Sequence, residues 1–507
     1  MGGSSSTASA PAEARELREQ EALASAALSL PLLRAVFSRS ADLAATLSLP
    51  PTSFRSAPPL ETPAHFQDLL ASLGPTIASL FFPRGASEDA GAGGWLGFLK
   101  GFNSCCARAR ASLPLAVLLR VYAAACAAAG APCGVQFRPG EDGGGDEEGG
   151  KVVGELAPGE IAVLLSMCWV MAWSGLAPRV SGGEEGGKGE AVLLPDVSHL
   201  VLSALVSAGA VADDEGVWGW EVSGAGKGVS VQEFTSWVIS TVPGLGNCLS
   251  RYVQDRFRSS ESDPAKESSV STGNTTFDTC DAYLLTRGRA WSISLSVRNT
   301  LSEKFLSASV IGMDTGDLLY SENVDAGRKW GIGVLTEDGF ENKDTFYGSS
   351  GFLCATYPIF RMLLPSGKEK NIMYCHLHTQ LKTYEATPKP LGLAFGGSIG
   401  NERIFIDEDF SKVTIRHHAV DKTYQHGSLI PNQGYLPVEA SILDFEVWGL
   451  GGQTTKRQQD IFKKREDIFS GQRRKIDLAA FGNWEDSPEK MMMDMVSDPN
   501  KARREER

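Results

Sequence analysis

The hydrophobic periodicity of the chain changes at a polar segment near its middle, and this change constrains the fold more than any other feature. Residues 258–276 (RSSESDPAKESSVSTGNTT) are serine-rich and have the composition of a linker. Before them, apolar residues recur at helical spacing, as in Leu113–Ala129, which only Arg120 interrupts. After them, apolar and polar residues alternate, as in half-buried strands. We therefore expect an α+β multidomain protein, with an all-α half at 15–257 and a strand-rich domain at 277–452.

Three stretches of the first half have a composition of their own. Residues 1–14 are rich in Gly, Ser, Ala and Pro and are expected to be disordered. Two acidic, glycine-rich inserts at 139–150 and 181–190 are expected to be solvated loops. The uncharged run Ile161–Pro178 is close to the lower length limit of a membrane span but contains Ser and Gly, so we interpret it as a buried helix.

Charge and cysteine content exclude several classes of protein. A net charge of −13 argues against nucleic-acid binding through the whole surface, because phosphate contacts need clustered Lys and Arg. The nine cysteines form no CxxC pair, and the N-terminus lacks the apolar core of a secretory signal. This pattern indicates a reducing cytosol or nucleus, with unpaired structural thiols.

Three segments after the linker show the period-two pattern of strands. In the first, Trp291, Ile293, Leu295 and Val297 alternate with polar residues, and the others are 404–406 and 443–447. Strands separated by glycine turns favour a sheet or a sandwich.

One segment of the first half resembles the end of an EF-hand loop. In Val222–Glu233, Glu233 stands at position 12 and Val229 at position 8. Calcium needs oxygen ligands at positions 1, 3 and 5, which here are Val222, Gly224 and Gly226. We expect an EF-hand-like helix pair that does not bind calcium.

The sequence GGSIG at 396–400 matches the G-x-S-x-G pattern of hydrolases, and Asp407, His417 and His418 follow Ser398 in the order Ser, Asp, His. A nucleophile elbow requires a helix after the serine, whereas the next residues predict a strand. A glycine-rich hairpin is therefore favoured, and a serine hydrolase using Ser398 is the alternative function.

The histidines raise the question of a metal. His376 and His378 would share one face of a strand and, with His417 and His418, could in principle bind zinc. Further ligands at a recognisable spacing are missing from the sequence, so we expect no metal and no cofactor.

Both ends of the chain carry signals for association. The start Met1-Gly2-Gly3-Ser4-Ser5-Ser6 fits N-myristoylation at Gly2, and a single acyl chain predicts reversible membrane association. The tail, 453–507, predicts a basic helix with a narrow apolar stripe, suited to a partner groove or an anionic membrane. Basic groups at 463–465 and 473–475 also resemble a nuclear signal, which leaves a nuclear stress adaptor as a further alternative. The stripe consists of Ile461, Phe462, Ile468, Phe469 and Ile476.

Four short motifs stand in order within residues 281–452: Phe346-Tyr347-Gly348, Phe395-Gly396-Gly397, Asp407-Glu408-Asp409 and Glu446-Val447-Trp448-Gly449. Through these motifs the segment resembles a TLDc domain, the plant-type members in particular. With the MG-Ser start, the helical half and the charged C-terminal helix, the layout is similar to the myristoylated branch, whose animal member is a lysosome-associated TOR-signalling protein.

The resemblance implies a compact β-sandwich with flanking helices and a non-enzymatic protein without accepted catalytic residues. It also implies binding to the V-type proton ATPase, a role in oxidative-stress resistance, and cytoplasmic location with recruitment to endolysosomal or vacuolar membranes. One departure is notable. Relatives usually carry a helix and an apolar strand after the segment matching 318–321, whereas only about eight polar residues, 322–329, occur here. We therefore expect a core strand to be missing near 321–330.

Overall fold

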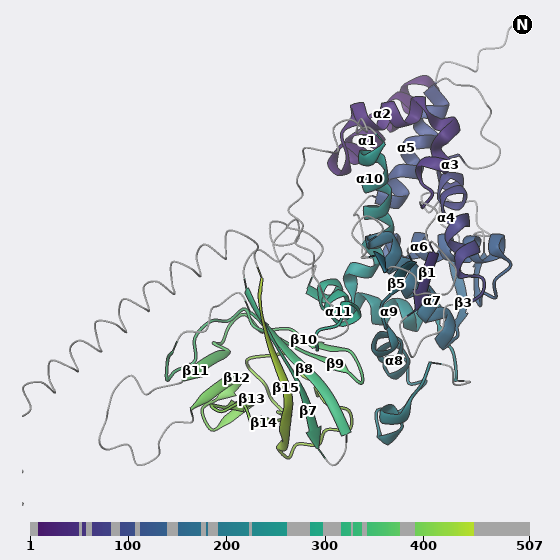
Figure 1. The fold of residues 1–507 in the computed structure, drawn as a ribbon. Helices are drawn as coiled ribbons and strands as arrows, with labels where there is room; N and C mark the ends of the chain where they lie inside the picture. Colours follow the sequence, from purple (N-terminus) through teal and green to yellow (C-terminus); the bar gives the residue numbers. More distant parts are fainter. Residues whose placement is uncertain are drawn as a thin grey trace, which may run out of the picture.

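The computed structural model describes residues 9–49, 53–56, 63–82, 92–106, 112–138, 151–173, 179–180, 191–222, 226–260, 284–297, 316–325, 328–336, 342–375 and 391–450. Helices occupy the first half and a large sheet the second (Figure 1). The mixed α+β class predicted from the change of period is therefore confirmed.

The helices of the first half follow one another between residues 9 and 259. They are α1 (Ser9–Ala27), α2 (Leu30–Ser38), α3 (Leu43–Thr46), α4 (Phe66–Phe81), α5 (Ala92–Cys106), α6 (Ser112–Ala129), α7 (Pro158–Trp173), α8 (Ser198–Ser207), α9 (Val231–Thr241) and α10 (Cys248–Ser259). Short 3-10 helices lie at Ser40–Asp42, Glu215–Gly219 and Pro243–Asn247.

Residues 161–173 of the uncharged run lie in α7, and for them the interpretation as a buried helix is confirmed. Residues 174–178 lie outside the described ranges. Leu164, Leu165, Cys168 and Trp169 are almost inaccessible, so the helix is apolar on every side because every side is covered. Across the described ranges, no single helix is long and apolar enough to cross a membrane; only the bent pair Ala14–Ala27 and Leu30–Ser38 passes together, by length and composition.

The first half is not all-α, because short strands flank both acidic inserts. Strand β2 (Val135–Arg138) pairs with β3 (Lys151–Leu156), which pairs with β6 (Val229–Ser230). Strand β5 (Ala191–Leu194) pairs with β4 (Arg179–Val180) and, in parallel, with β1 (Ser53–Ser56). The prediction missed that the inserts separate short β-branched segments that can pair.

The prediction of a strand around Trp291 is wrong, because this segment forms helix α11 (Arg287–Val297). The serines that looked like a solvent-facing side are buried: Ser292 donates a hydrogen bond to the Gly288 carbonyl (2.7 Å) and Ser296 to the Thr241 carbonyl (2.6 Å). With polar and apolar positions both buried, alternation in the sequence no longer reports a strand.

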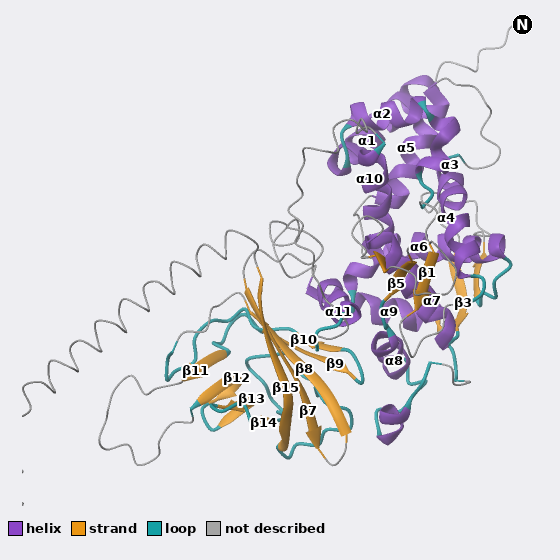
Figure 2. Cartoon of the chain, viewed as in Figure 1, coloured by secondary structure: helices purple, strands orange, loops and turns teal. Residues whose placement is uncertain are grey.

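The second half contains one antiparallel sheet of nine strands in the order β10-β9-β8-β7-β15-β14-β13-β12-β11 (Figure 2). These are β7 (Gly316–Asp325), β8 (Arg328–Thr336), β9 (Phe352–Tyr357), β10 (Arg361–Leu363), β11 (Ile372–Cys375), β12 (Gly392–Ser398), β13 (Asn401–Asp407), β14 (Lys412–Ile415) and β15 (Val438–Leu450). The strands predicted at 404–406 and 443–447 are confirmed as parts of β13 and β15.

The sheet is continuous through the segment where a missing strand was expected. Strand β7 pairs with β8 along its length, up to Asp325 opposite Arg328, and its other edge pairs with β15. The short connection is thus accommodated by direct pairing. A missing strand relative to the family stays a prediction.

The two faces of β9 bury against different cores. Phe352 and Cys354 join the core of the helical half, whereas Leu353 and Ala355 join the core of the sheet. The sheet core also takes residues from β12, β13 and β14, so strands from both parts of the sheet enclose one interior. Strand β9 therefore joins the helical half to the sheet.

Candidate functional site: the junction of helices and sheet

The junction is held by hydrogen bonds between α8 and the turn after β9. The Phe360 amide donates to the His199 carbonyl (3.1 Å), and Ser203 Oγ donates to the Phe360 carbonyl (2.7 Å). Trp237 Nε1 from α9 donates to the same Ser203 oxygen (3.0 Å). Three elements that are distant in sequence are thus fixed around one buried serine.

Helix α11 contacts the junction through Ser292, which lies against His199 of α8. His199 Nε2 lies 2.5 Å from Ser292 Oγ, and Ser292 gives its own proton to the Gly288 carbonyl. His199 therefore donates from Nε2. Burial lowers the pKa of His199 to about 4; Asp196 opposes this and Arg289 adds to it. The imidazole is consequently neutral near pH 7.

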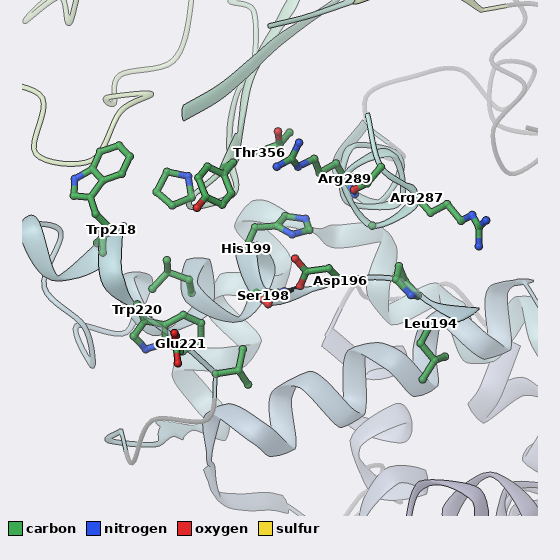
Figure 3. A pocket seen from close by; sticks show the side chains of 18 of the residues that line it. Leu194, Asp196, Ser198, His199, Trp218, Trp220, Glu221, Arg287, Arg289 and Thr356 are labelled. Atoms are coloured by element: carbon green, nitrogen blue, oxygen red, sulfur yellow. Dashed lines mark hydrogen bonds between the residues drawn. The ribbon is translucent and has the colours of Figure 1, made fainter. Parts of the chain in front are cut away.

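A cavity of about 450 Å³ opens beside this histidine (Figure 3). Its wall comes from the start of α8, the segment 217–222, the start of α11 and the end of β9. Trp218, Trp220 and Tyr357 contribute aromatic rings to the wall, and Asp196, Glu221, Arg287 and Arg289 contribute charged groups. In Figure 3, Arg289 points toward Thr356, whereas Arg287 points away from it.

Aromatic and charged contacts close the rim of the junction. Trp218 lies 6.3 Å from Trp330 of β8, centroid to centroid, and Arg328 lies 5.8 Å from the Trp218 ring centroid. Arg361 of β10 pairs with Asp213 at 2.6 Å. Each of these contacts joins a residue of the helical half to a residue of the sheet. Aromatic and charge-paired contacts of this kind are typical of protein interfaces.

The junction has the parts of a rigid interface, and its buried serine, Ser292, is not placed as a nucleophile. Ser292 is fully buried and its proton is committed to a backbone carbonyl, so it cannot act as a nucleophile on a substrate in the cavity. Within the ranges that the structure describes, no group of three or more His, Cys, Asp or Glu side chains is arranged to hold a metal.

The predicted glycine motif forms a hairpin. Ser398 and Asn401 face each other across the turn between β12 and β13, so the serine is followed by a strand. Asp407 pairs with Gly392 at the far end of the same strands, about 20 Å away at 3.3 Å per residue. A Ser398–Asp407–histidine triad is thus not assembled, and the hairpin interpretation of the motif is confirmed.

Phe395, Gly396 and Gly397 pack against a loop that follows β14. Phe395 is fully buried, and the Gly397 amide donates to Thr423 Oγ1 (3.0 Å). Gly396 and Gly397 have φ of +67° and +72°, and a Cβ on Gly396 would lie 2.5 Å from the Tyr424 ring. Glycine is required here for backbone conformation and for close packing.

That loop is organised by a buried ion pair that the sequence analysis missed. Arg403 Nη1 lies 2.5 Å from Asp421 Oδ2, and both side chains are 1% exposed. Arg403 Nη2 also donates to the Gly427 carbonyl. Burial raises the pKa of Asp421, but hydrogen bonds from Thr423 and Tyr424, with the Arg403 charge, outweigh it and lower the pKa overall.

The motif Asp407-Glu408-Asp409 forms the acidic turn between β13 and β14. Glu408 and Asp409 are exposed, and the Phe410 amide donates to the Asp407 carbonyl (3.0 Å). Burial and the charge of Asp409 raise the pKa of Asp407. The turn places carboxylates at one end of the sheet, available to a cationic partner.

The other motif residues lie in the sheet and in the segments that pair with it. Tyr347 is buried and exchanges backbone hydrogen bonds with Ile372; Phe346 is half-buried and Gly348 has φ of +61°. Glu446 accepts hydrogen bonds from the Leu284 (2.7 Å) and Leu285 (3.1 Å) amides and so attaches the entry of α11 to β15. In β15, Trp448 is opposite Leu318 and Gly449 opposite Asp317.

In the segment that resembles the end of an EF-hand loop, Glu233 caps the start of a helix. Val229 pairs with Leu156 between β6 and β3, and Glu233 forms a capping box with Ser230 at the start of α9. Glu160, four residues after Leu156, accepts hydrogen bonds from Gly134 and Ala157 in the same way. Both glutamates thus bind backbone amides.

Several predicted residues lie outside the described ranges. They are Gly2, His376, His378 and the stripe Ile461, Phe462, Ile468, Phe469 and Ile476. His417 and His418 are described: His417 stacks on Tyr435 (4.9 Å between centroids), and His418 Nδ1 lies 3.9 Å from Asp421. They belong to the packed loop.

The fold defines the class of protein: it has a helical half that packs against an antiparallel sheet, and hydrogen bonds and aromatic contacts join the two parts. A family model of the TLDc domain matches residues 319–451, so the chain contains a TLDc domain and the nine-stranded sheet belongs to it. The family resemblance inferred from the motifs is confirmed for this part of the chain. No curated protein matches the chain in sequence.

The junction itself can be tested at Gly288. A Cβ there would lie 2.0 Å from the Asp196 backbone oxygen, so we expect Gly288→Ala to separate α11 from this segment and to lower the free energy of unfolding by about 1–3 kcal/mol. Gly159→Ala is the matched control: it lies in α7 with nothing within 4 Å, and we expect no loss. Chemical denaturation measures both. Equal effects would contradict the packing argument.

Proposed function

We propose that this chain is a non-enzymatic TLDc-type regulatory protein of the myristoylated branch that binds the V-type proton ATPase. In this proposal it associates reversibly with endolysosomal or vacuolar membranes through an acyl chain on Gly2 and contributes to oxidative-stress resistance. The observation that carries the proposal is the TLDc match at residues 319–451, over a sheet whose motif glycines serve turns and packing.

Two features of the described residues support a binding role. The acidic turn at 407–409 offers exposed carboxylates at the end of a rigid sheet, a suitable contact for a basic partner surface. The junction fixes the helical half to the same sheet, so both would be presented to a partner as one unit. The β-sandwich description of the domain and the contact role of the stripe 461–476 belong to this proposal.

The proposal is tested by affinity capture with full-length protein, tagged at the C-terminus so that Gly2 stays free. Subunits of the V-type ATPase are expected to co-purify from detergent-solubilised vacuolar or lysosomal membranes at low and moderate salt. Recovery of no ATPase subunit at either salt concentration would refute the binding proposal.

The variant Gly2→Ala separates lipid anchoring from protein binding. It should still capture the ATPase from detergent extract, because the protein contacts remain. In flotation with intact membranes it should be recovered several-fold less than the unaltered chain, because one acyl chain gives only marginal anchoring. Equal flotation of the two proteins would remove Gly2 from the proposal.

A further inference from the structure

The loop between β14 and β15, residues 416–437, contributes buried side chains to the sheet core. Leu429 and Ile430 of this loop are at most 5% exposed and belong to that core. The loop also pairs with the segment after β10, because the Ser366 amide donates a hydrogen bond to the Thr423 carbonyl (2.8 Å). The loop therefore has to stay in place for the core to stay closed.

Two of the three histidines in this loop, His417 and His418, have a buried ring nitrogen without a hydrogen-bond partner, in each case Nε2. The His417 ring lies 5.4 Å from the His426 ring, centroid to centroid, and stacks on Tyr435 at 4.9 Å. His418 Nδ1 lies 3.9 Å from Asp421 Oδ2, which is beyond hydrogen-bond distance. A proton on either Nε2 would be a buried positive charge without an acceptor, which is costly. We call His417 and His418 the histidine pair.

The fixed charges beside the histidine pair already balance. Arg403 lies 2.5 Å from Asp421, and Arg416 lies 3.5 Å from Glu402, with both carboxylates at most 3% exposed. Asp421 Oδ1 also accepts hydrogen bonds from two backbone amides and one hydroxyl. Each proton that the pair takes up thus adds a positive charge that these two carboxylates do not compensate. The charged and titratable groups that face the pair or its neighbouring arginines are Arg403 and Glu402 of β13, and Arg416, Asp421, His426 and Tyr435 of the loop.

We propose that the histidine pair is a pH-sensitive switch that allows the loop 416–437 to close while both rings are neutral and loosens it when either is protonated. Burial lowers the pKa of both histidines in the closed loop; the Arg403 charge adds to this, and Asp421 opposes it at His418. A histidine with a lowered pKa contributes stability that is complete above its unfolded pKa, near 6.5, and is lost as the pH falls below it. Asp421, whose pKa is lowered, stays charged over this range.

Amide hydrogen exchange of the full-length protein tests the switch. The Ser366 amide and the Gln425 amide, which donates to the Leu364 carbonyl (2.9 Å), report closure of the loop. After correction for intrinsic exchange, we expect their protection to fall between about pH 7.5 and pH 5.5, by up to about tenfold for each histidine that binds a proton only in the open loop. Amides of helix α6 serve as the internal reference and should keep their protection. Unchanged protection of Ser366 and Gln425, or an equal fall in α6, would overturn the proposal.

Variants separate the pair from the third histidine of the loop. The double variant His417→Phe with His418→Phe keeps two rings that cannot bind a proton, so the pH dependence of both amides should disappear. His426→Phe is the matched control: His426 is exposed in the same loop, and we expect this variant to keep the dependence. Isotope labelling of the histidine rings in the unaltered chain gives the pKa values by NMR without any substitution, and both are expected to lie below about 6.5. A full pH dependence in the double variant, its loss in His426→Phe, or ordinary pKa values for the pair would contradict the switch.

Discussion

Replacing Arg403 with methionine is expected to lower the free energy of unfolding of the sheet by about 3–5 kcal/mol. The substitution keeps the apolar stem but removes the guanidinium that faces Asp421, whose side chain is 1% exposed. The carboxylate is then left buried without its counter-charge, and the Gly427 carbonyl loses a donor. Denaturant unfolding followed by tryptophan fluorescence measures the loss.

Arg416→Met is the matched control for this experiment. Arg416 also faces a buried carboxylate, Glu402, but at 3.5 Å and with 22% of its own side chain exposed. Because solvent screens such a pair, we expect a loss of about 1 kcal/mol or less. The double variant Arg403→Met with Asp421→Asn removes the unpaired charge but keeps an acceptor for the Thr423 and Tyr424 amides, so it should regain part of the stability. If Arg403→Met costs no more than Arg416→Met, the buried pair does not organise the loop.

The sequence predicted those elements whose pattern depends on local spacing. Helix α7 was predicted because the uncharged run is entered through Pro158 and contains Ser and Gly, which favour a buried helix over a membrane span. Strand β13 was predicted because Ile404 and Ile406 share the buried face. Glycines 396 and 397 were correctly placed in a hairpin because no helix pattern follows them.

The sequence could not predict elements whose character depends on distant partners. Ser292 and Ser296 looked solvent-facing, and only their contacts with His199 and with backbone carbonyls explain why they are buried in a helix. His199 and Ser292 are 93 residues apart, so no spacing rule connects them. The same holds for Arg403 and Asp421, which in sequence are unremarkable charges beside a strand and in a loop. Such pairs are visible only after folding.

Glycine 397 provides the second large effect. We expect Gly397→Ala to lower the free energy of unfolding by about 2–5 kcal/mol, the sum of a left-handed backbone and a steric clash. Its φ is +72°, and a Cβ would lie 2.2 Å from the Asn401 carbonyl oxygen and 2.9 Å from the His418 ring. The clash is with backbone across the hairpin, so it cannot be relieved by a side-chain rotation.

Gly400→Ala separates the two contributions, because Gly400 lies in the same hairpin, has φ of +84° and has nothing within 4 Å of the added Cβ. It should lose only the backbone part, about 1–2 kcal/mol. Denaturant unfolding of both variants gives the difference directly, and equal losses would mean that backbone conformation alone selects glycine at 397. A larger loss at 397 shows that close packing across the hairpin, in addition to the backbone conformation, selects glycine at this position.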